Sequence, residues 1–318
     1  MKCSEFTFHM LYEIALTPDA LNRSLCGSPE VWRLVMGELG RFLQQDGLIR
    51  NLRNGDWLQS MSAGELDPLA REILELAKKE GRLTRATPQL KTVPGNAEEW
   101  CWEAEASRAV TPLAGIVVGQ QAMEGRDESQ GLTLIERLTG ANWWRERRGS
   151  VRLFRSGLEY QRVLGPLMRH SGRLMFIDPY IDPSVARYRA LIDLVLMAFR
   201  PDGCPPVIEL HRAASVGGGK DILSRKSVES MFEPLTKALM KAQMKVSLYV
   251  WHEFHDRYLI SNLAGLTIPN GFDTDEKKGA LKTTFSFIST ADRVDVERDF
   301  DPNSGKHHLH FGGPISLG

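Results

Sequence analysis

The chain lacks several features that would place it in a class at once. Its 318 residues include 40 basic and 40 acidic side chains, so the formal net charge at pH 7 is zero. The chain therefore has no overall positive charge that would favour nucleic acid or acidic lipid as the partner. A local basic patch is compatible with this balance. The four cysteines form no CxxC pair, which argues against a zinc ribbon or a redox dithiol: Cys3, Cys26, Cys101 and Cys204.

Long apolar segments are missing as well. No run approaches the ~20 apolar residues that a spanning helix needs. The stretch MKCSEFTFHMLYEIAL lacks the basic start and clean apolar stretch of a signal peptide. Together with cysteines that are most simply read as reduced thiols, this predicts a cytoplasmic protein. No internal repeat, heptad array or low-complexity tract is present, which excludes repeat architectures.

Residues 1–125 show mixed helix and strand patterns, so we expect a smaller α/β N-terminal domain of unknown type. Apolar residues at helical spacing predict one helix that opens with proline in PEVWRLVMGELGRFLQQDG and stops at Gly47. They predict another over Asp67 to Lys79, which Gly81 closes. Asn54-Gly55 is a strong turn signal and predicts a hairpin. Two short apolar runs predict strands, Leu90 to Val93 and the PLAGIVVGQ segment.

Between residues 126 and 150 the sequence becomes polar and is broken by glycines, with one helical piece at Leu132 to Leu138. We therefore expect a linker or domain boundary here. Residues 151–318 then alternate helix and strand up to KVSLYVW, which predicts a largely parallel sheet with helices on its faces. The short strands YLIS, GLTIP and TFSFIST predict an antiparallel extension of that sheet. The expected fold class is α/β, with a mixed C-terminal sheet flanked by helices.

The stretch HEFHDRYLIS at 252–261 is the main candidate site, because ligands of such sheets bind beyond the carboxyl ends of the strands. If the chain is extended here, His255 and Arg257 share a face. The arginine supplies a rigid fork of donors for phosphate oxygens, and the histidine can donate, carry a proton or attack. The simpler interpretation is a solvated turn held by internal ion pairs.

A resemblance adds weight to the functional interpretation. The pieces YQRVLGPLMRHSGRLMFIDPYID, ALIDLVLM and FHDRYLISNLAGLTIPNGFD follow one another over residues 150–302. In this order they resemble the phospholipase-D-like domain that follows the MIT domain in an ESCRT-associated eukaryotic protein (the MIT_C type). The segment PNGFD departs from that domain, because it lacks the basic residue of the Gly-Arg-Gly found there.

The resemblance also implies a comparison with the phospholipase D motif His-x-Lys-x4-Asp, in which the histidine attacks phosphorus. Placed on this sequence, the motif gives His255, Arg257 and Asn262. Arginine can still stabilise a phosphoryl transition state. Covalent catalysis also needs a second histidine as general acid, from a second motif copy or from the other subunit of a homodimer. Only one copy is present, so we expect phosphate binding without turnover; the alternative is an active nuclease or phosphodiesterase.

Further residues are expected around this site. Asp178, Tyr180, Asp182 and His252 would line the cleft, and the alternative for the Asp-Pro segment is turn chemistry at the end of a strand. The loop SVGGGKD lacks the spacing of a phosphate-binding loop, but it could bring Lys220 to His255 as the missing cation. We expect no metal: the segment KHHLHF has no nearby cysteine or suitably placed carboxylate.

In the first part, Glu13, Glu103 and Glu105 beside strands would suit a two-metal ribonuclease of the PIN type, but solvated surface acids are the more common case. The segment ANWWRERRG mixes tryptophan with arginine, as single-strand binders do, and interdomain packing is the alternative.

The sequence thus predicts a binder of nucleic acid or another phosphate-bearing ligand that needs no cofactor. The resemblance suggests a bacterial phage-defence or mobile-element locus, which would also supply a partner protein. A scaffold that binds protein or membrane partners is a third interpretation.

Overall fold

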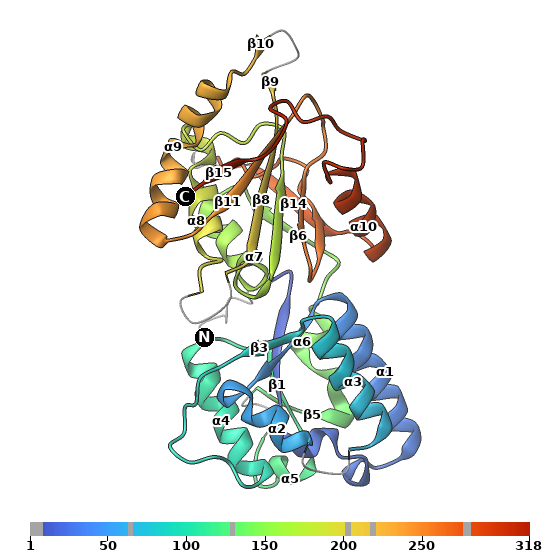
Figure 1. Ribbon diagram of the computed structural model, residues 1–318. Helices are drawn as coiled ribbons and strands as arrows, with labels where there is room; N and C mark the ends of the chain where they lie inside the picture. Colours follow the sequence, from blue (N-terminus) through green and yellow to red (C-terminus); the bar gives the residue numbers. More distant parts are fainter. Residues whose placement is uncertain (1–8, 63–65, 128–130, 201–204, 217–220, 276–280) are drawn as a thin grey trace. The chain divides into compact units, whose positions relative to one another are not determined.

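The computed structural model describes residues 9–62, 66–127, 131–200, 205–216, 221–275 and 281–318. It is a mixed α/β protein that divides into two compact units (Figure 1). The inserted unit is Leu11–Arg147, and the main unit is Arg148–Gly318 together with the residues up to Met10. Two bonds tie the residues before the inserted unit to the main unit: Met10 N donates to Val163 O, and His9 Nδ1 donates to Arg162 O.

The inserted unit is built on a five-stranded parallel sheet of order β3-β2-β1-β4-β5. Its strands are β1 (Tyr12–Leu16), β2 (Gly47–Asn51), β3 (Leu83–Arg85), β4 (Gly115–Val118) and β5 (Leu132–Leu134). Its helices are α1 (Pro29–Gln45), α2 (Asp56–Ser62), α3 (Pro68–Lys79), α4 (Ala97–Val110), α5 (Gln120–Met123) and α6 (Asn142–Arg145). Short 3-10 turns at Pro18–Leu21, Arg23–Leu25, Arg53–Gly55 and Ile135–Gly140 connect them.

Local sequence signals account for the two long helices of this unit that were predicted. The side chains of Ser28 and Asp67 accept backbone hydrogen bonds at the starts of α1 and α3, and proline occupies the first turn of each. Both predicted helices and the PLAGIVVGQ strand are confirmed. The side chains of Trp32, Phe42 and Trp57 fill the core between the helices and the sheet.

Three predictions for this region are wrong. Asn54 and Gly55 do take positive φ, but the chain then enters α2, and β2 pairs in parallel with β1 and β3 instead of forming a hairpin. Leu90 to Val93 forms no strand, since the Leu90 amide donates to the Glu103 carboxylate. Leu132 to Leu138 is strand β5 and a 3-10 turn, because pairing with β4 overrides a short helical pattern.

The main unit contains an eight-stranded mixed sheet of order β15-β11-β8-β7-β12-β13-β14-β6. Its strands are β6 (Ser150–Phe154), β7 (Arg173–Ile177), β8 (Val207–Ala213), β11 (Val246–Trp251), β12 (Tyr258–Ser261), β13 (Gly265–Thr267), β14 (Lys282–Phe287) and β15 (Ile315–Leu317). A separate ribbon joins β9 (Ser215–Val216) and β10 (Asp221–Ile222). The helices are α7 (Gly157–His170), α8 (Ala190–Leu196), α9 (Arg225–Ala242) and α10 (Thr290–Asp299), with a 3-10 turn at Ala186–Tyr188.

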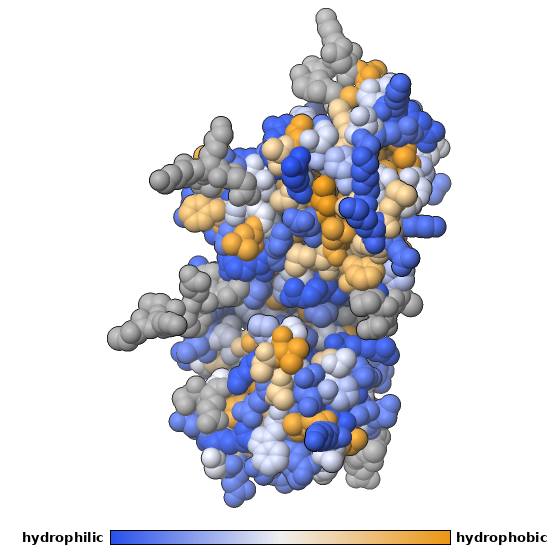
Figure 2. Space-filling view, turned by 90° about the vertical axis from the view of Figure 1, so that its left-hand side faces the viewer, coloured by the Kyte–Doolittle hydropathy of each residue, from blue (hydrophilic) through white to orange (hydrophobic). Residues whose placement is uncertain are grey.

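The predicted order of helix and strand in this unit is confirmed. Strands β7, β8 and β11 are parallel, and β12, β13, β14 and β6 extend the sheet in antiparallel fashion from β7. Alternate residues of the strands serve different faces. Met175, Ile177 and Trp251 pack with Val296 of α10, whereas α8 and α9 lie on the other side of the sheet (Figure 1). On the face shown in Figure 2, hydrophilic side chains surround separate hydrophobic patches.

Candidate functional site

The main candidate site lies at the edge of the mixed sheet where β7, β8 and β11 end and β12 begins. Tyr258, the first residue of β12, pairs with Ile177, the last residue of β7. The residues just outside this pair, Arg257 and Asp178, are therefore neighbours. Arg257 Nε lies 3.9 Å from Asp178 Oδ1, and its guanidinium carbon lies 5.3 Å from the centre of the Tyr180 ring. The structure thus brings together three of the predicted site residues.

Asp178 is the anchor of this group. Its side chain is fully buried, its Oδ1 accepts a hydrogen bond from Tyr180 N, and its Oδ2 accepts from Phe272 N and from the Tyr188 hydroxyl. Burial raises the pKa of Asp178 above its ordinary value, and these hydrogen bonds and Arg257 offset the rise only in part. A buried carboxylate with three donors positions its neighbours and has no access to a ligand.

The conformation and surroundings of Gly271 explain why the PNGFD segment has a glycine at this position. Its φ is +65°, a conformation that side-chain-bearing residues seldom adopt, and a Cβ at this position would overlap the Asp178 carboxylate. The close approach lets the next amide, that of Phe272, reach Asp178 Oδ2 at 3.1 Å. The segment that departs from the resembled domain therefore has a structural role at the same carboxylate.

The loop that carries Tyr180 is fixed along its backbone. Asp178 N donates to His211 O, and Pro179 O accepts from Ala213 N. Beyond Tyr180, the Ile181 carbonyl accepts a hydrogen bond of 2.9 Å from Nη1 of buried Arg212. These bonds hold the loop to the end of β8, yet Tyr180 itself is 38% exposed.

Arg257 is positioned with its fork accessible. Its side chain is 30% exposed. Within the described residues, its terminal nitrogens form no hydrogen bond, and Asp178 and Tyr180 are its charge and ring neighbours. The arrangement leaves two parallel donors for a planar pair of oxygen acceptors.

His255 is placed differently. Its side chain is exposed, and within the described part of the chain it forms no hydrogen bond, ion pair or ring contact. Strand β12 begins only at Tyr258, so His255 and Arg257 lie in the connecting segment rather than in the strand. Their predicted pairing on one face stays a prediction.

Three other predicted site residues make local contacts. The His252 amide donates a hydrogen bond to His308 O, and its ring lies 5.1 Å from the ring of His310. His252 therefore contacts the C-terminal KHHLHF segment. Asp182 Oδ1 accepts bonds from Ser184, which is turn chemistry. Asn262 follows the far end of β12, where its Oδ1 accepts from the amides of Gly172 and Arg173. The structure does not bring Asn262 to Arg257.

Lys220 and the glycines before it lie outside the described residues. Among the residues that the structure does describe, no group of three or more histidine, cysteine or acidic side chains is arranged to hold a metal ion. His307 of KHHLHF packs against Phe300 with ring centres 4.8 Å apart.

Comparisons with known proteins give no family. No protein-family model matches the chain, and no curated protein matches it significantly. Among solved structures, phosphatidylserine synthase of Haemophilus influenzae Rd KW20 matches with a TM-score of 0.31 and 12% identity, over 50% of this chain and 39% of the synthase. An archaeal chromatin protein described as having a novel mode of DNA binding matches with a TM-score of 0.31 and 11% identity, over 81% of this chain and 87% of that protein. Similarity at this level assigns neither a fold nor an activity to this chain.

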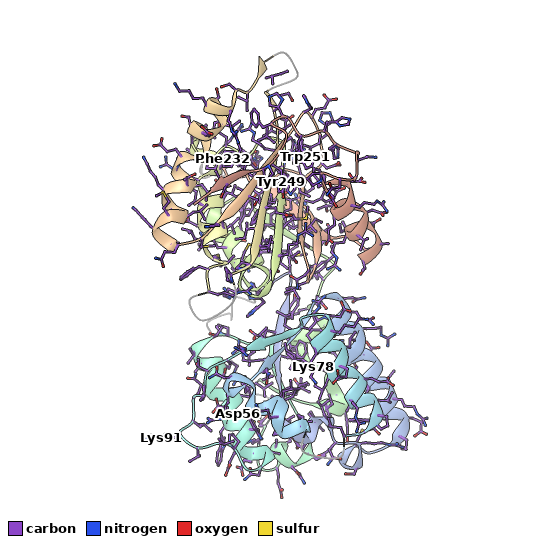
Figure 3. All side chains as sticks on the ribbon, viewed as in Figure 1. Asp56, Lys78, Lys91, Phe232, Tyr249 and Trp251 are labelled. Carbon is purple, nitrogen blue, oxygen red and sulfur yellow. The ribbon has the colours of Figure 1, made fainter. Side chains whose placement is uncertain are left out.

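Sequence reasoning missed the polar residues inside β8. His211 is buried, and its Nδ1 accepts a hydrogen bond from Trp251 Nε1. Its ring stacks on Tyr249, which with Trp251 marks β11 in Figure 3. Glu209 forms an ion pair of 2.9 Å with Arg173 on the neighbouring strand β7. The signal was the three polar residues of ELHR, Glu209, His211 and Arg212, within an otherwise apolar strand.

The acids of the inserted unit that suggested a two-metal site all have arginine partners. Glu13 pairs with buried Arg50, and Glu103 pairs with Arg53 and accepts two backbone hydrogen bonds. Glu105 pairs with Arg126 at 3.0 Å. Glu103 is fully buried in its own network, and Glu13 is nearly so. These contacts account for the three carboxylates as structural groups.

The WWRERR segment also packs within the inserted unit. The Trp144 and Phe42 rings lie 5.4 Å apart, and the Arg147 guanidinium lies over the Trp144 ring at 4.1 Å. Arg147 Nε donates to Asp46 Oδ2 at 2.9 Å. These aromatic and arginine side chains are therefore engaged with one another.

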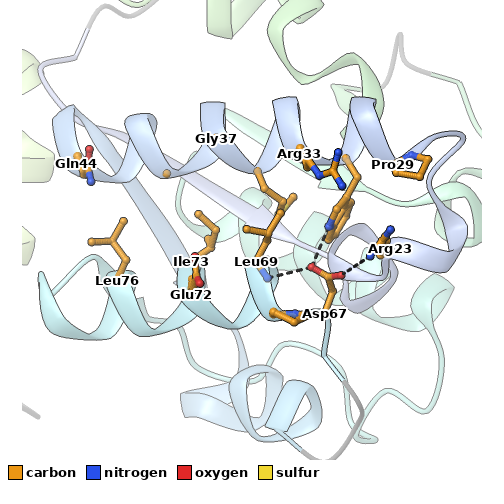
Figure 4. A pocket seen from close by; sticks show the side chains of 14 residues that line it. Arg23, Pro29, Arg33, Gly37, Gln44, Asp67, Leu69, Glu72, Ile73 and Leu76 are labelled. Atoms are coloured by element: carbon orange, nitrogen blue, oxygen red, sulfur yellow. Dashed lines mark hydrogen bonds and ion pairs between the residues drawn. The ribbon is translucent and has the colours of Figure 1, made fainter.

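A groove of about 760 Å³ runs between α1 and α3 (Figure 4). Gly37 and Gly40 line the α1 side of the groove, where they add no side chain, and Asp67 lies at one end. The Asp67 carboxylate accepts hydrogen bonds from Trp32 Nε1 and Leu69 N and pairs with Arg23 at 3.6 Å. Its acceptors are thus engaged by the groove's own residues.

In the described part of the chain, no helix is both long and apolar enough to cross a membrane.

Proposed function

We propose that the main unit binds a phosphodiester, with nucleic acid as the ligand, through Arg257 at the end of the mixed sheet. One observation carries the proposal. Arg257 lies beside buried Asp178, with Nε 3.9 Å from Oδ1, and beside the Tyr180 ring, while its terminal nitrogens have no partner among the described residues. The side chain is 30% exposed, so these unpaired donors belong to a partly exposed arginine.

The chemistry of the fork favours phosphate. A guanidinium matches two oxygens of a phosphate or carboxylate, and it keeps its charge at every physiological pH. The position agrees with this, because β7, β8 and β11 are parallel and all end at this edge. With zero net charge over the chain, binding would depend on this local cation rather than on a general field.

Binding without turnover is the better-supported form of the proposal. A nucleophilic histidine needs a partner that orients its ring, and His255 has none within the described residues. The motif's third position, Asn262, is engaged with backbone amides at the other end of β12. Nuclease activity with His255 as nucleophile, and a second histidine from a homodimer, is the alternative that the same experiment tests.

The wider assignment depends on the sequence resemblance alone. On that basis we propose that residues 150–302 are a phospholipase-D-like domain of the MIT_C type with a degenerate motif. The proposal of a cytoplasmic protein from a phage-defence or mobile-element locus, with a partner protein from the same locus, has the same support. We further propose that the two compact units, Leu11–Arg147 and Arg148–Gly318 with the residues up to Met10, correspond to separate domains.

The proposal is tested by fluorescence anisotropy with a labelled oligonucleotide over a series of salt concentrations. Loss of one phosphate contact in Arg257→Ala should weaken binding and reduce the slope of log affinity against log salt by about 1. Lys237→Ala is the control, since it removes an equally positive side chain that is 68% exposed on α9. The control should leave the slope unchanged.

An unchanged slope in Arg257→Ala would contradict the proposed contact. The same samples, incubated without divalent metal and examined on a denaturing gel, test the alternative. Cleavage by the wild type that disappears in His255→Ala would establish the nuclease. Intact oligonucleotide in every lane would leave binding as the function.

A further inference from the structure

Tyr180 is 38% exposed on a loop whose backbone is hydrogen-bonded to β8. The loop is tied through Asp178 N, Pro179 O and the Ile181 carbonyl to residues of β8, and Tyr180 N is bonded to Asp178 Oδ1. Exposed aromatic rings are unfavourable in water but offer a large contact area that loses little conformational entropy on binding. A fixed, exposed ring beside a cation is therefore suited to a flat ligand group.

The ring and the cation are arranged for one ligand. The Arg257 guanidinium carbon lies 5.3 Å from the Tyr180 ring centre, so a phosphate held by Arg257 is adjacent to the ring. In a single strand, the base next to that phosphate is free to turn onto an aromatic side chain. In a duplex, the same base is paired and stacked in the helix, and only the phosphate is accessible.

We propose that Tyr180 is a stacking platform that makes the Arg257 site selective for single-stranded over double-stranded nucleic acid. The inference rests on the proposed function, because it takes Arg257 as the phosphate contact. It assigns Tyr180 a contact with the base itself, beyond its position beside Arg257. The hydroxyl is not needed for this role, whereas the aromatic ring is.

The test compares two probes of one sequence, a labelled single strand and the duplex that it forms with its complement. Tyr180→Phe keeps the ring and should bind both probes as the wild type does. Tyr180→Leu should lose about tenfold in affinity for the single strand, as expected for one stacked base. Its loss for the duplex should be less than about twofold, so the ratio of the two affinities falls.

Two controls separate stacking from other effects. Phe199→Leu removes another exposed aromatic ring of the main unit, 47% exposed beyond α8, and should leave the ratio unchanged. A single strand in which all bases are replaced by abasic sites should bind the wild type about as weakly as the normal strand binds Tyr180→Leu. Thermal unfolding of each variant shows that the protein is folded.

The outcomes distinguish the two proposals. Equal losses for both probes in Tyr180→Leu would show that the ring merely supports Arg257, and the stacking inference would then be wrong while phosphate binding stands. Tight binding of the abasic strand would also overturn it. If Arg257→Ala binds both probes as the wild type does, or if the wild type binds neither, the proposed function fails and the inference fails with it.

Discussion

The indole Nε1 of Trp251 donates a hydrogen bond of 3.0 Å to Nδ1 of His211. Since Nδ1 is the acceptor, a neutral ring carries its proton on Nε2. The nearest acid to that nitrogen is Glu209, whose Oε2 is 3.9 Å away, too far for a hydrogen bond. His211 is thus a fully enclosed imidazole of defined tautomer at the centre of the main unit.

This environment predicts a pH dependence of stability. Burial lowers the pKa of His211 below its ordinary value of 6.5, and the charge of Glu209 only partly opposes this. Below pH 6.5 the unfolded chain takes up a proton that the folded protein excludes, so the free energy of unfolding falls as the pH falls. Well above pH 6.5 this proton no longer affects the free energy of unfolding. Below it, the free energy of unfolding falls by at most about 1.4 kcal/mol per pH unit from this one group.

Urea unfolding at several pH values between about 7.5 and 5 measures the slope. In His211→Gln the slope should be smaller than in the wild type, though not zero, because burial also lowers the pKa of His9 and His307. Equal slopes in the wild type and in His211→Gln would show that folding does not exclude the proton from His211.

Gly271→Ala should destabilise the main unit by about 1 to 3 kcal/mol. The substitution combines a φ of +65° with a Cβ that overlaps the Asp178 carboxylate. Gly305→Ala is a matched control, because its φ is +72° and its Cβ would meet nothing within 4 Å. Thermal unfolding of both variants separates the backbone cost from the overlap, and similar midpoints would contradict the close approach to Asp178.

Glu13→Ala should cost about 3 to 5 kcal/mol of stability in the inserted unit, because it leaves the Arg50 charge buried without its carboxylate. The pair is joined by two hydrogen bonds, of 3.0 Å from Arg50 Nε and 2.6 Å from Nη2. Glu105→Ala removes the same kind of group from the more exposed pair with Arg126 and should cost about 0 to 1 kcal/mol. Urea unfolding compares them, and equal losses would argue against a buried charge at Arg50.

The sequence was most informative where a short pattern sufficed. Apolar spacing with a closing glycine predicted α1 and α3, and alternating helix and strand predicted the parallel core of the main unit. It failed where distant contacts decide the backbone. The Asn54-Gly55 turn looks the same before a helix as before a strand, and β5 is a strand only because β4 lies beside it.

The candidate site shows the same division. Residues adjacent in sequence to strand ends, Asp178 and Arg257, were predicted together and lie together. The role of Gly271 was not predictable, because it depends on a carboxylate 93 positions earlier in the chain, from 178 to 271. Motif spacing suggested Asn262 beside Arg257. The four residues of β12, however, carry the chain to the other end of the strands, where β7 begins.

The bonds of His9 and Met10 to the Arg162–Val163 backbone have a consequence for biosynthesis. The ribosome synthesises residues 11–147 before α7, the helix that these two residues contact. The inserted unit is therefore complete when almost none of the main unit has been synthesised. Translation proceeds at about 5 to 20 residues per second, so residues 148–318 take roughly 9 to 34 seconds more. His9 and Met10 can form their bonds only after Arg162 and Val163 have been synthesised.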